Sequence, residues 1–306
     1  MIGFIVRRLA VAILVGLAVS ILSFALVRLT GDVATAIAGE GARDEDIRLV
    51  RETYGLDRPV IVQYLDWLAG LVRGEFGTSY FFKSPVIDLV LDKLPTTLTL
   101  GLLSLLFALV VAVPLGVIAA LRPNSWIDRF ALGIAVLGQA MPNFFFALLL
   151  IMLLSITLRW LPVSGSGTWL HFVMPTIALG YYVTPAFMRL IRAGMIETLN
   201  SDFIRTARAK GVSRPRVVLR HGLRNALTPI VALAVVQLGY LLGGSVVIET
   251  VFALDGLGYL AYQSITHKDL PVMQVVVLFL SMLYVLLTLF ADVLNAYLDP
   301  RLRAGM

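Results

Sequence analysis

Residues 96–121 read TTLTLGLLSLLFALVVAVPLGVIAAL and contain no charged side chain. A helix needs about 20 mostly apolar residues to cross a bilayer, so this stretch predicts a transmembrane helix. Five further stretches satisfy the same requirement: residues 9–27, 130–158, 172–190, 227–247 and 272–294. Pro114, Pro142 and Pro185 lie inside three of these six stretches, and we expect these helices to tolerate proline because neighbouring helices satisfy the freed carbonyls.

The composition of the whole chain also indicates a membrane protein. Charged residues make up only 14% of the 306 residues and hydrophobic residues 59%, whereas a soluble domain carries roughly 25% charge. The prediction is an all-α polytopic membrane protein with six transmembrane helices. We expect the first helix within residues 1–30, the other five within residues 95–295, and a cytoplasmic tail at residues 296–306.

The first apolar stretch has flanks like those of a signal peptide. Arg7 and Arg8 precede it, and Ala36-Ile37-Ala38 follows. Its apolar run is longer than the roughly 7 to 15 residues of a signal-peptide core. We therefore expect residues 1–30 to form a membrane anchor.

Loop charges predict the orientation, because short cytoplasmic loops are enriched in Lys and Arg. With a cytoplasmic N-terminus, acids outnumber bases in the outer residues 31–94. The inner segments then hold Arg7, Arg8, Arg122, Arg129, Arg189, Arg192, Arg205, Arg208, Lys210, Arg214, Arg216, Arg220, Arg224, Arg301 and Arg303. An even number of spans returns the C-terminus to the cytoplasm. The net charge of +6 then follows from topology, which disfavours nucleic acid as a partner.

Residues 31–94 are too polar to enter the bilayer and too long for a linker. Ile47, Val50 and Tyr54 share one helical face, and a second stripe runs from Ile61 to Val72. Pro59 is typical of the start of that second helix. We expect two short amphipathic helices outside the membrane, and we favour a packing role for them over contact with a substrate.

The sequence lacks the residues and motifs with which a transporter supplies its own energy. Ion-coupled transporters usually carry ionisable residues within their spans, and the central membrane depth here has only uncharged polar ones. A P-loop needs glycine before its lysine, and no glycine precedes Lys83, Lys93, Lys210 or Lys268. Cysteine is absent and the three histidines are far apart in sequence, so we predict no metal site and no bound cofactor. The energy source must be another chain.

The inner loop, residues 197–228, is the candidate receiver of that energy. It contains a short helix that begins at Ser201-Asp202 and ends at Gly211. Phe203, Ala207 and Lys210 share one side of it. Such a helix can lie in a groove of a soluble partner. The residues alone equally allow a basic loop that obeys the positive-inside rule and contacts anionic lipid.

Uncharged polar residues in the spans are candidates for the transport pathway. They are Gln139, Asn143, Tyr181, Gln237 and Tyr240. Hydrogen bonding between helices is an equally common role for such residues.

The inner loop resembles a known family motif. Thr206-Ala207-Arg208-Ala209-Lys210-Gly211 followed by His221-Gly222-Leu223-Arg224 is similar to the "EAA" loop of binding-protein-dependent ABC importer permeases. Gly211 and the motif spacing are kept, with Arg205-Thr206-Ala207 in place of Glu-Ala-Ala. His221 and Arg224 replace an Ile and a Pro, as in the branch that handles oligopeptides, dipeptides, glutathione and nickel.

Three further stretches resemble the first permease subunit of the same branch, in the same order. They are Tyr54-Gly55-Leu56-Asp57-Arg58-Pro59 with Gly74-Glu75-Phe76-Gly77, then Gly243-Gly244-Ser245 to Glu249 with Gly256-Leu257-Gly258, and finally Asp299-Pro300-Arg301. The resemblance covers nearly the whole chain.

This resemblance implies a type I importer fold in a bacterial inner membrane. It also implies a second permease subunit, identical or related, two cytoplasmic ATPase subunits that hold ATP and Mg, and an extracytoplasmic solute-binding protein. The short helix of the inner loop would be the coupling helix, the element through which the permease contacts the ATPase. Ala207 and Gly211 would pack closely against the ATPase. The full set of contact residues would be Asp202, Phe203, Arg205, Thr206, Ala207, Arg208, Ala209, Lys210, Gly211 and Arg214. Peptides, glutathione, nickel chelates and opines are the solutes of this branch, and the sequence does not choose among them.

Two other classes of function compete with an importer permease. A self-sufficient channel would conduct solute without an ATPase. A polytopic membrane enzyme would need paired carboxylates or a histidine cluster at membrane depth, and the spans contain neither.

Overall fold

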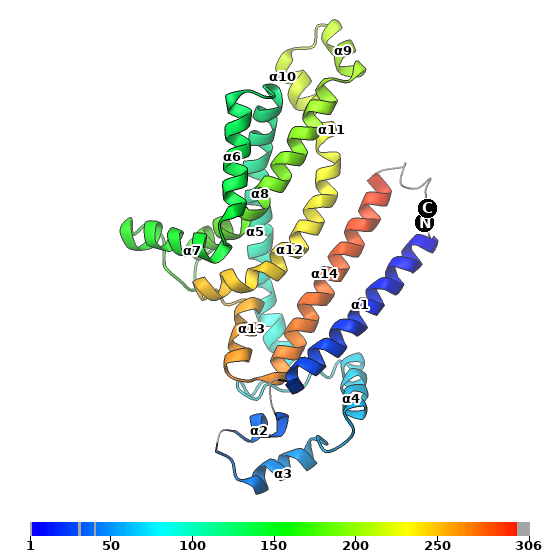
Figure 1. Ribbon diagram of the computed structural model, residues 1–306, viewed down its shortest axis with the longest axis vertical. Helices are drawn as coiled ribbons and strands as arrows, with labels where there is room; N and C mark the ends of the chain where they lie inside the picture. The colour runs from blue at the N-terminus through cyan, green and yellow to red at the C-terminus, as the bar shows by residue number, and fades with distance from the viewer. Residues whose placement is uncertain (1, 30–31, 40, 299–306) are drawn as a thin grey trace.

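The structure is a computed structural model that describes residues 2–29, 32–39 and 41–298 (Figure 1). The described residues are mostly helical, and the one strand-like pairing among them is an isolated bridge between Thr78 and Pro85. The predicted all-α fold class is confirmed.

Five long helices form the main part of the molecule. They are α1 (Ile2–Leu29), α5 (Val86–Leu121), α8 (Leu170–Leu199), α12 (Thr228–Phe252) and α14 (Leu270–Leu298). All but α8 contain a segment that is long and apolar enough to cross a membrane. Each helix coincides with one predicted stretch, and most run on beyond it.

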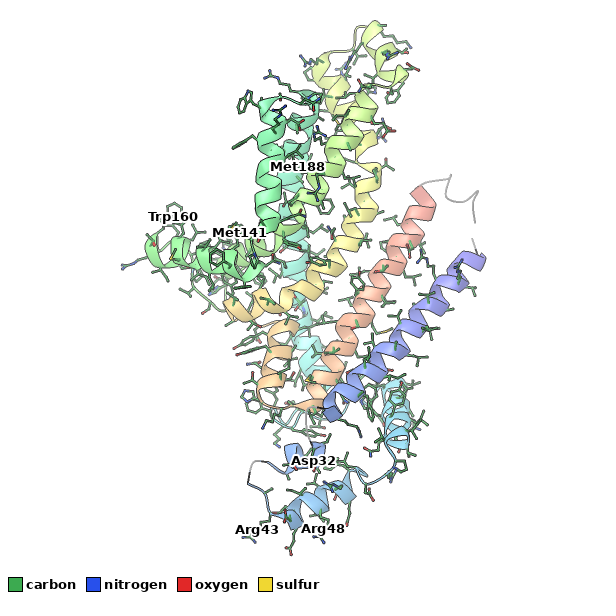
Figure 2. All side chains as sticks on the ribbon, in the orientation of Figure 1. Asp32, Arg43, Arg48, Met141, Trp160 and Met188 are labelled. Carbon is green, nitrogen blue, oxygen red and sulfur yellow. The ribbon has the colours of Figure 1, made fainter. Side chains whose placement is uncertain are left out.

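The prediction of one helix over residues 130–158 is wrong. The chain forms α6 (Trp126–Ala140), then α7 (Asn143–Leu150), which continues as the π-helix η1 (Ile151–Thr157). Met141, between α6 and α7, is extended (φ −91°, ψ 132°), because Pro142 disfavours helical backbone in the residue before it. Figure 1 shows α7 running sideways from the end of α6. Figure 2 shows Met141 at this junction and Trp160 near the tip of the side arm.

Three short helices lie between α1 and α5. They are α2 (Val33–Ala38), α3 (Asp44–Thr53) and α4 (Val60–Arg73). The last two confirm the predicted amphipathic pair, with Pro59 directly before α4, whereas the sequence pattern does not predict α2. Figure 1 shows these helices at one end of the molecule and α9 (Asp202–Ala209) at the other. We call the two ends the α3 end and the α9 end.

The centre of the fold is the contact of α5 with α8. Gly180 on α8 permits it, because a Cβ there would lie 2.6 Å from the carbonyl oxygen of Ser104 on α5. α12 packs against both helices, and α14 lies between α12 and α1. α13 (Leu257–Thr266) contacts α5, α12 and α14. In Figure 1, α1 and α14 diverge from the α5–α8–α12 group toward the α9 end.

Candidate functional site

α9 extends past the long helices at the α9 end (Figure 1). It begins after Ser201, whose backbone is extended (φ −74°, ψ 156°). Asp202 in the first turn places a negative charge where the helix dipole favours it. The helix confirms the predicted start, and it ends at Ala209 with Lys210 as its C-cap.

One side chain fastens α9 to the rest of the chain. Ile204 is fully buried, and it is the only buried residue of the helix. The sequence reasoning missed this anchor, although Ile204 is the sole branched aliphatic residue among the eight of α9.

The residues after α9 mount it on the end of α8. They form α10 (Arg214–Arg216), the π-helix η2 (Val217–Leu223) and α11 (Arg224–Ala226). Val217 and Val218 are buried. Gly222 allows η2 to lie close to α8, because a Cβ there would meet the side chains of Met195 and Leu199 at 3.2 and 3.3 Å.

Gly211 ends α9 through its backbone. Its φ is +78°, a left-handed conformation that glycine adopts without steric cost. The N–H of Gly211 donates to the carbonyl of Arg208 (3.0 Å), and the N–H of Val212 to that of Ala207 (3.2 Å). This pair of bonds is the Schellman motif. A Cβ on Gly211 would meet no atom within 4 Å, so the surrounding chain leaves this position open.

The other predicted contact residues are accessible. Ala207 is half-buried, and the rest are exposed: Asp202, Phe203, Arg205, Thr206, Arg208, Ala209, Lys210, Gly211 and Arg214. Asp202 and Arg205 pair at 3.2 Å with most of both side chains in solvent, and such pairs contribute little. Phe203 is 48% exposed, so an aromatic ring and several cations face outward together.

An ion pair that sequence reasoning missed ties α8 to α6. Arg192 donates to both oxygens of Asp128, at 2.6 Å each, and Asp128 also accepts from the N–H of Asn124 (2.8 Å). The Asp128 side chain is only 2% exposed. Bidentate bonds of this kind are strong and fix geometry, so α6 should move with the end of α8 that carries α9.

Three of the predicted pathway residues gather at the break between α6 and α7. Tyr181 donates to the carbonyl of Met141 (2.6 Å), and Gln139 accepts from Arg189 (3.2 Å). The buried Oδ1 of Asn143 has no hydrogen-bond partner among the described residues. The hydroxyl of Tyr181 is instead occupied by the backbone carbonyl at the helix break.

The other two pathway residues, Gln237 and Tyr240, lie on α12. The ring of Tyr240 stacks on Tyr182 at 5.8 Å and remains 45% exposed. Among the side chains that the structure describes, no hydrogen bond or ring contact joins Gln237 and Tyr240 to the group at the break. Whether either group lines the pathway stays a prediction.

A buried carboxylate organises the α3 end. Glu249 is fully buried and accepts from the hydroxyls of Thr97 (2.9 Å) and Ser245 (2.8 Å). It also accepts from the N–H groups of Gly258 (2.7 Å) and Tyr259 (3.2 Å) at the start of α13. All four bonds are made within this chain. They stabilise a buried carboxylate in a helix that is otherwise uncharged.

Apolar helices long enough to cross a membrane, with a short basic helix beyond their ends, are features of a membrane permease. The chain belongs to the family described as binding-protein-dependent transport system inner membrane component, whose sequence model matches residues 112–304. The model of the family's N-terminal part matches residues 1–101. The protein is therefore a multi-pass inner-membrane permease subunit of an ABC importer.

Similar proteins and structures agree with this membership. The glutathione transport system permease proteins GsiC of Escherichia coli strain K12 and of Shigella dysenteriae serotype 1 are each 40% identical to the chain, over 99% of both sequences. The inward-facing MetNI methionine ABC transporter has a TM-score of 0.57 at 22% identity, covering 70% of this chain and 98% of that one. An amino acid ABC transporter with histidines has a TM-score of 0.50 at 19% identity, covering 70% and 94%. These two structures share the fold.

Proposed function

We propose that this permease imports glutathione or another peptide-like solute, and that partner ATPase subunits drive it through α9. The α9 end faces the cytoplasm in this proposal, together with both termini, and the α3 end faces outward. The 40% identity to GsiC over the full length supports the solute class. Loop charge supports the orientation.

Membership of the family supports a set of partners for this proposal. An extracytoplasmic binding protein delivers the solute at the α3 end, and a second permease subunit completes the pathway. Two cytoplasmic subunits bind ATP with Mg and hydrolyse it, whereas this chain holds neither. The residues proposed to contact the ATPase are Asp202, Phe203, Arg205, Thr206, Ala207, Arg208, Ala209, Lys210, Gly211 and Arg214.

The proposal rests on the attachment of α9 to the end of α8. The outward side of α9 is accessible, while Ile204 and η2 fix it to α8. A force applied to α9 would pass into α8, and the Arg192–Asp128 pair would pass it on to α6. The break at Met141 would then change position, since it lies at the other end of α6.

Uptake by reconstituted vesicles tests this function. We expect vesicles that contain the complete transporter and its binding protein to accumulate labelled glutathione or dipeptide only when ATP is supplied to the ATPase side. Vesicles with this chain alone serve as the control. Solute flux through that control would favour a self-sufficient channel. Uptake of a nickel chelate in place of glutathione and peptides would contradict the proposed solute class.

A further inference from the structure

A cavity of about 260 Å³ lies at the α3 end, away from α9 and from the polar residues of the spans. The end of α1, α2, the turn before α4, α4 itself and the start of α14 contribute to its lining. Its charged lining residues are Arg28, Arg58 and Asp66. Two positive charges and one negative charge leave a net +1.

Arg28 carries that surplus charge. Arg58 pairs with Asp66 at 3.3 Å, whereas no ion pair joins Arg28 to a carboxylate in the part of the chain that the structure describes. Arg28 donates to the amide oxygen of Gln63 and lies 4.1 Å from the centre of the Phe24 ring. Burial lowers the pKa of the Arg28 guanidinium. Guanidinium has five donors in a planar fork, and most of them are not used by Gln63.

The cavity also offers a neutral hydroxyl. The phenol of Tyr80 is protonated at neutral pH, as is usual for tyrosine, and can donate a hydrogen bond; burial raises its pKa further, to about 12. Arg28 and Tyr80 both line the cavity. A cationic fork and a neutral donor that line one cavity suit an oxyanion such as phosphate.

The surroundings of the cavity favour lipid as the source of that oxyanion. Arg28 lies in the last turn of α1, just beyond its membrane-spanning segment Val6–Ala25. The rings of Tyr64 and Trp67 of α4 pack on the ring of Phe24, with centres 5.3 and 5.6 Å away. Tyr and Trp are enriched at the membrane–water interface of membrane proteins.

α4 also has an uncovered apolar side. Ile61 is 69% exposed, Leu65 55% and Val72 84%, and their spacing places them on one helical face. An amphipathic helix beside the end of a spanning helix fits the boundary between lipid head groups and acyl chains. Acyl chains would cover this side of α4, with the head group within reach of the cavity.

We propose that this cavity binds the phosphate of an anionic phospholipid, with Arg28 as its main ligand and Tyr80 as a second donor. The surplus of one positive charge selects a lipid with a net negative head group over a zwitterionic one. In the orientation of the proposed function this is an outer-leaflet site, but the binding chemistry does not depend on that orientation.

Native mass spectrometry of the full-length chain tests the site. The protein, in detergent, is offered equal amounts of phosphatidylglycerol and phosphatidylcholine. We expect the wild type to retain phosphatidylglycerol preferentially, and Arg28→Gln to retain roughly tenfold less of it, because charge-assisted bonds to phosphate are lost. Arg48→Gln is the control, since Arg48 is an exposed arginine at the same end of the molecule that does not line the cavity. It should retain the lipid as the wild type does.

Further arms keep the test decisive. Arg28→Lys keeps the charge without the planar fork, and the amount of phosphatidylglycerol that it retains should fall between those of the wild type and Arg28→Gln. This second variant keeps the site testable if Arg28→Gln folds poorly. Equal retention of the two lipids by the wild type, or undiminished phosphatidylglycerol on a folded Arg28→Gln, would overturn the proposal. Displacement of the lipid from the wild type by millimolar inorganic phosphate would also overturn it, and would assign the cavity to a soluble anion.

Discussion

At the scale of single residues, Gly211 has two separable reasons to be glycine. The structure gives the first, since the Schellman motif needs φ of +78° there. The resemblance implies the second, which is close packing of bare backbone against the ATPase. Asparagine tolerates the left-handed conformation but adds a side chain, so it separates the two.

We expect Gly211→Asn to leave the thermal stability of the permease unchanged and to abolish most ATP-driven uptake. Gly211→Val should lose uptake equally and also weaken the end of α9, by about 1–2 kcal/mol. Uptake assays with thermal unfolding of both variants make the comparison. Normal uptake by Gly211→Asn would mean that the glycine serves only to end the helix.

Glu249 supports a stability prediction at the same scale. Replacement by Gln should cost about 1 kcal/mol, because the hydroxyls of Thr97 and Ser245 can turn to accept from the amide while its oxygen keeps the two N–H bonds. Replacement by Leu leaves the N–H groups of Gly258 and Tyr259 unpaired, at about 1–3 kcal/mol each.

Thermal unfolding in detergent measures both losses at Glu249. Glu52→Gln on the exposed part of α3 is the control and should unfold like the wild type. Equal losses for the Gln and Leu variants would show that the four hydrogen bonds of Glu249 do not stabilise the fold.

At the scale of helices, local pattern predicts most of the elements, and contacts between distant residues decide the rest. The loop helix is predicted to start at Ser201-Asp202 and does so, because its start and stop residues are local. The same reasoning treats Pro142 like Pro114 and Pro185, yet those two lie inside continuous helices. Pro142 differs in its surroundings, since Tyr181, 40 residues away, satisfies the carbonyl of Met141. No local signal reports such a partner.

The candidate site divides in the same way. Exposure of the α9 residues agrees with their sequence pattern, whereas the Asp128–Arg192 pair joins residues that are 64 positions apart. From the sequence alone, a positive charge near the end of a span indicates only the orientation of the chain in the membrane. Only the fold shows that Arg192 binds α6.

The ion pair between α6 and α8 should respond unequally to loss of its two partners. Arg192→Gln strands a carboxylate that is 2% exposed and should cost about 3–5 kcal/mol. Asp128→Asn should cost less, because Arg192 is 23% exposed and can reach solvent.

Thermal unfolding tests this order, and the ratio of uptake to ATP hydrolysis tests transmission. We expect both variants to hydrolyse more ATP per solute imported than the wild type. Arg205→Gln, which breaks only the exposed pair with Asp202, should leave stability unchanged. A ratio like that of the wild type in a folded Asp128→Asn variant would rule out transmission through this pair.

At the scale of the whole molecule, α9 and α3 mark opposite ends (Figure 1), so a single labelling experiment tests orientation and docking together. The chain has no cysteine, which makes an introduced thiol unique in it. Phe203 on α9 and Arg48 on α3 are both exposed, and Figure 2 shows Arg48 pointing away from the molecule.

In right-side-out vesicles, an impermeant maleimide should label Arg48→Cys and leave Phe203→Cys unlabelled. In inverted vesicles, Phe203→Cys should react, and the ATPase subunits should protect it. Arg48→Cys is the matched control for protection. Equal labelling of Phe203→Cys with and without ATPase would remove α9 from the docking surface, and its labelling from outside would reverse the proposed orientation.

The four bonds of Glu249 also bear on how the chain is made. Thr97 precedes Glu249 by 152 residues, so α5 has been synthesised well before α12 reaches the bilayer. The N–H groups of Gly258 and Tyr259 follow within ten residues. An unpaired carboxylate in a span is costly, whereas this one meets its first interhelical partner on a helix that is already present. Insertion of α12 should therefore depend on α5, and the order of the helices along the chain is part of how this permease enters its membrane.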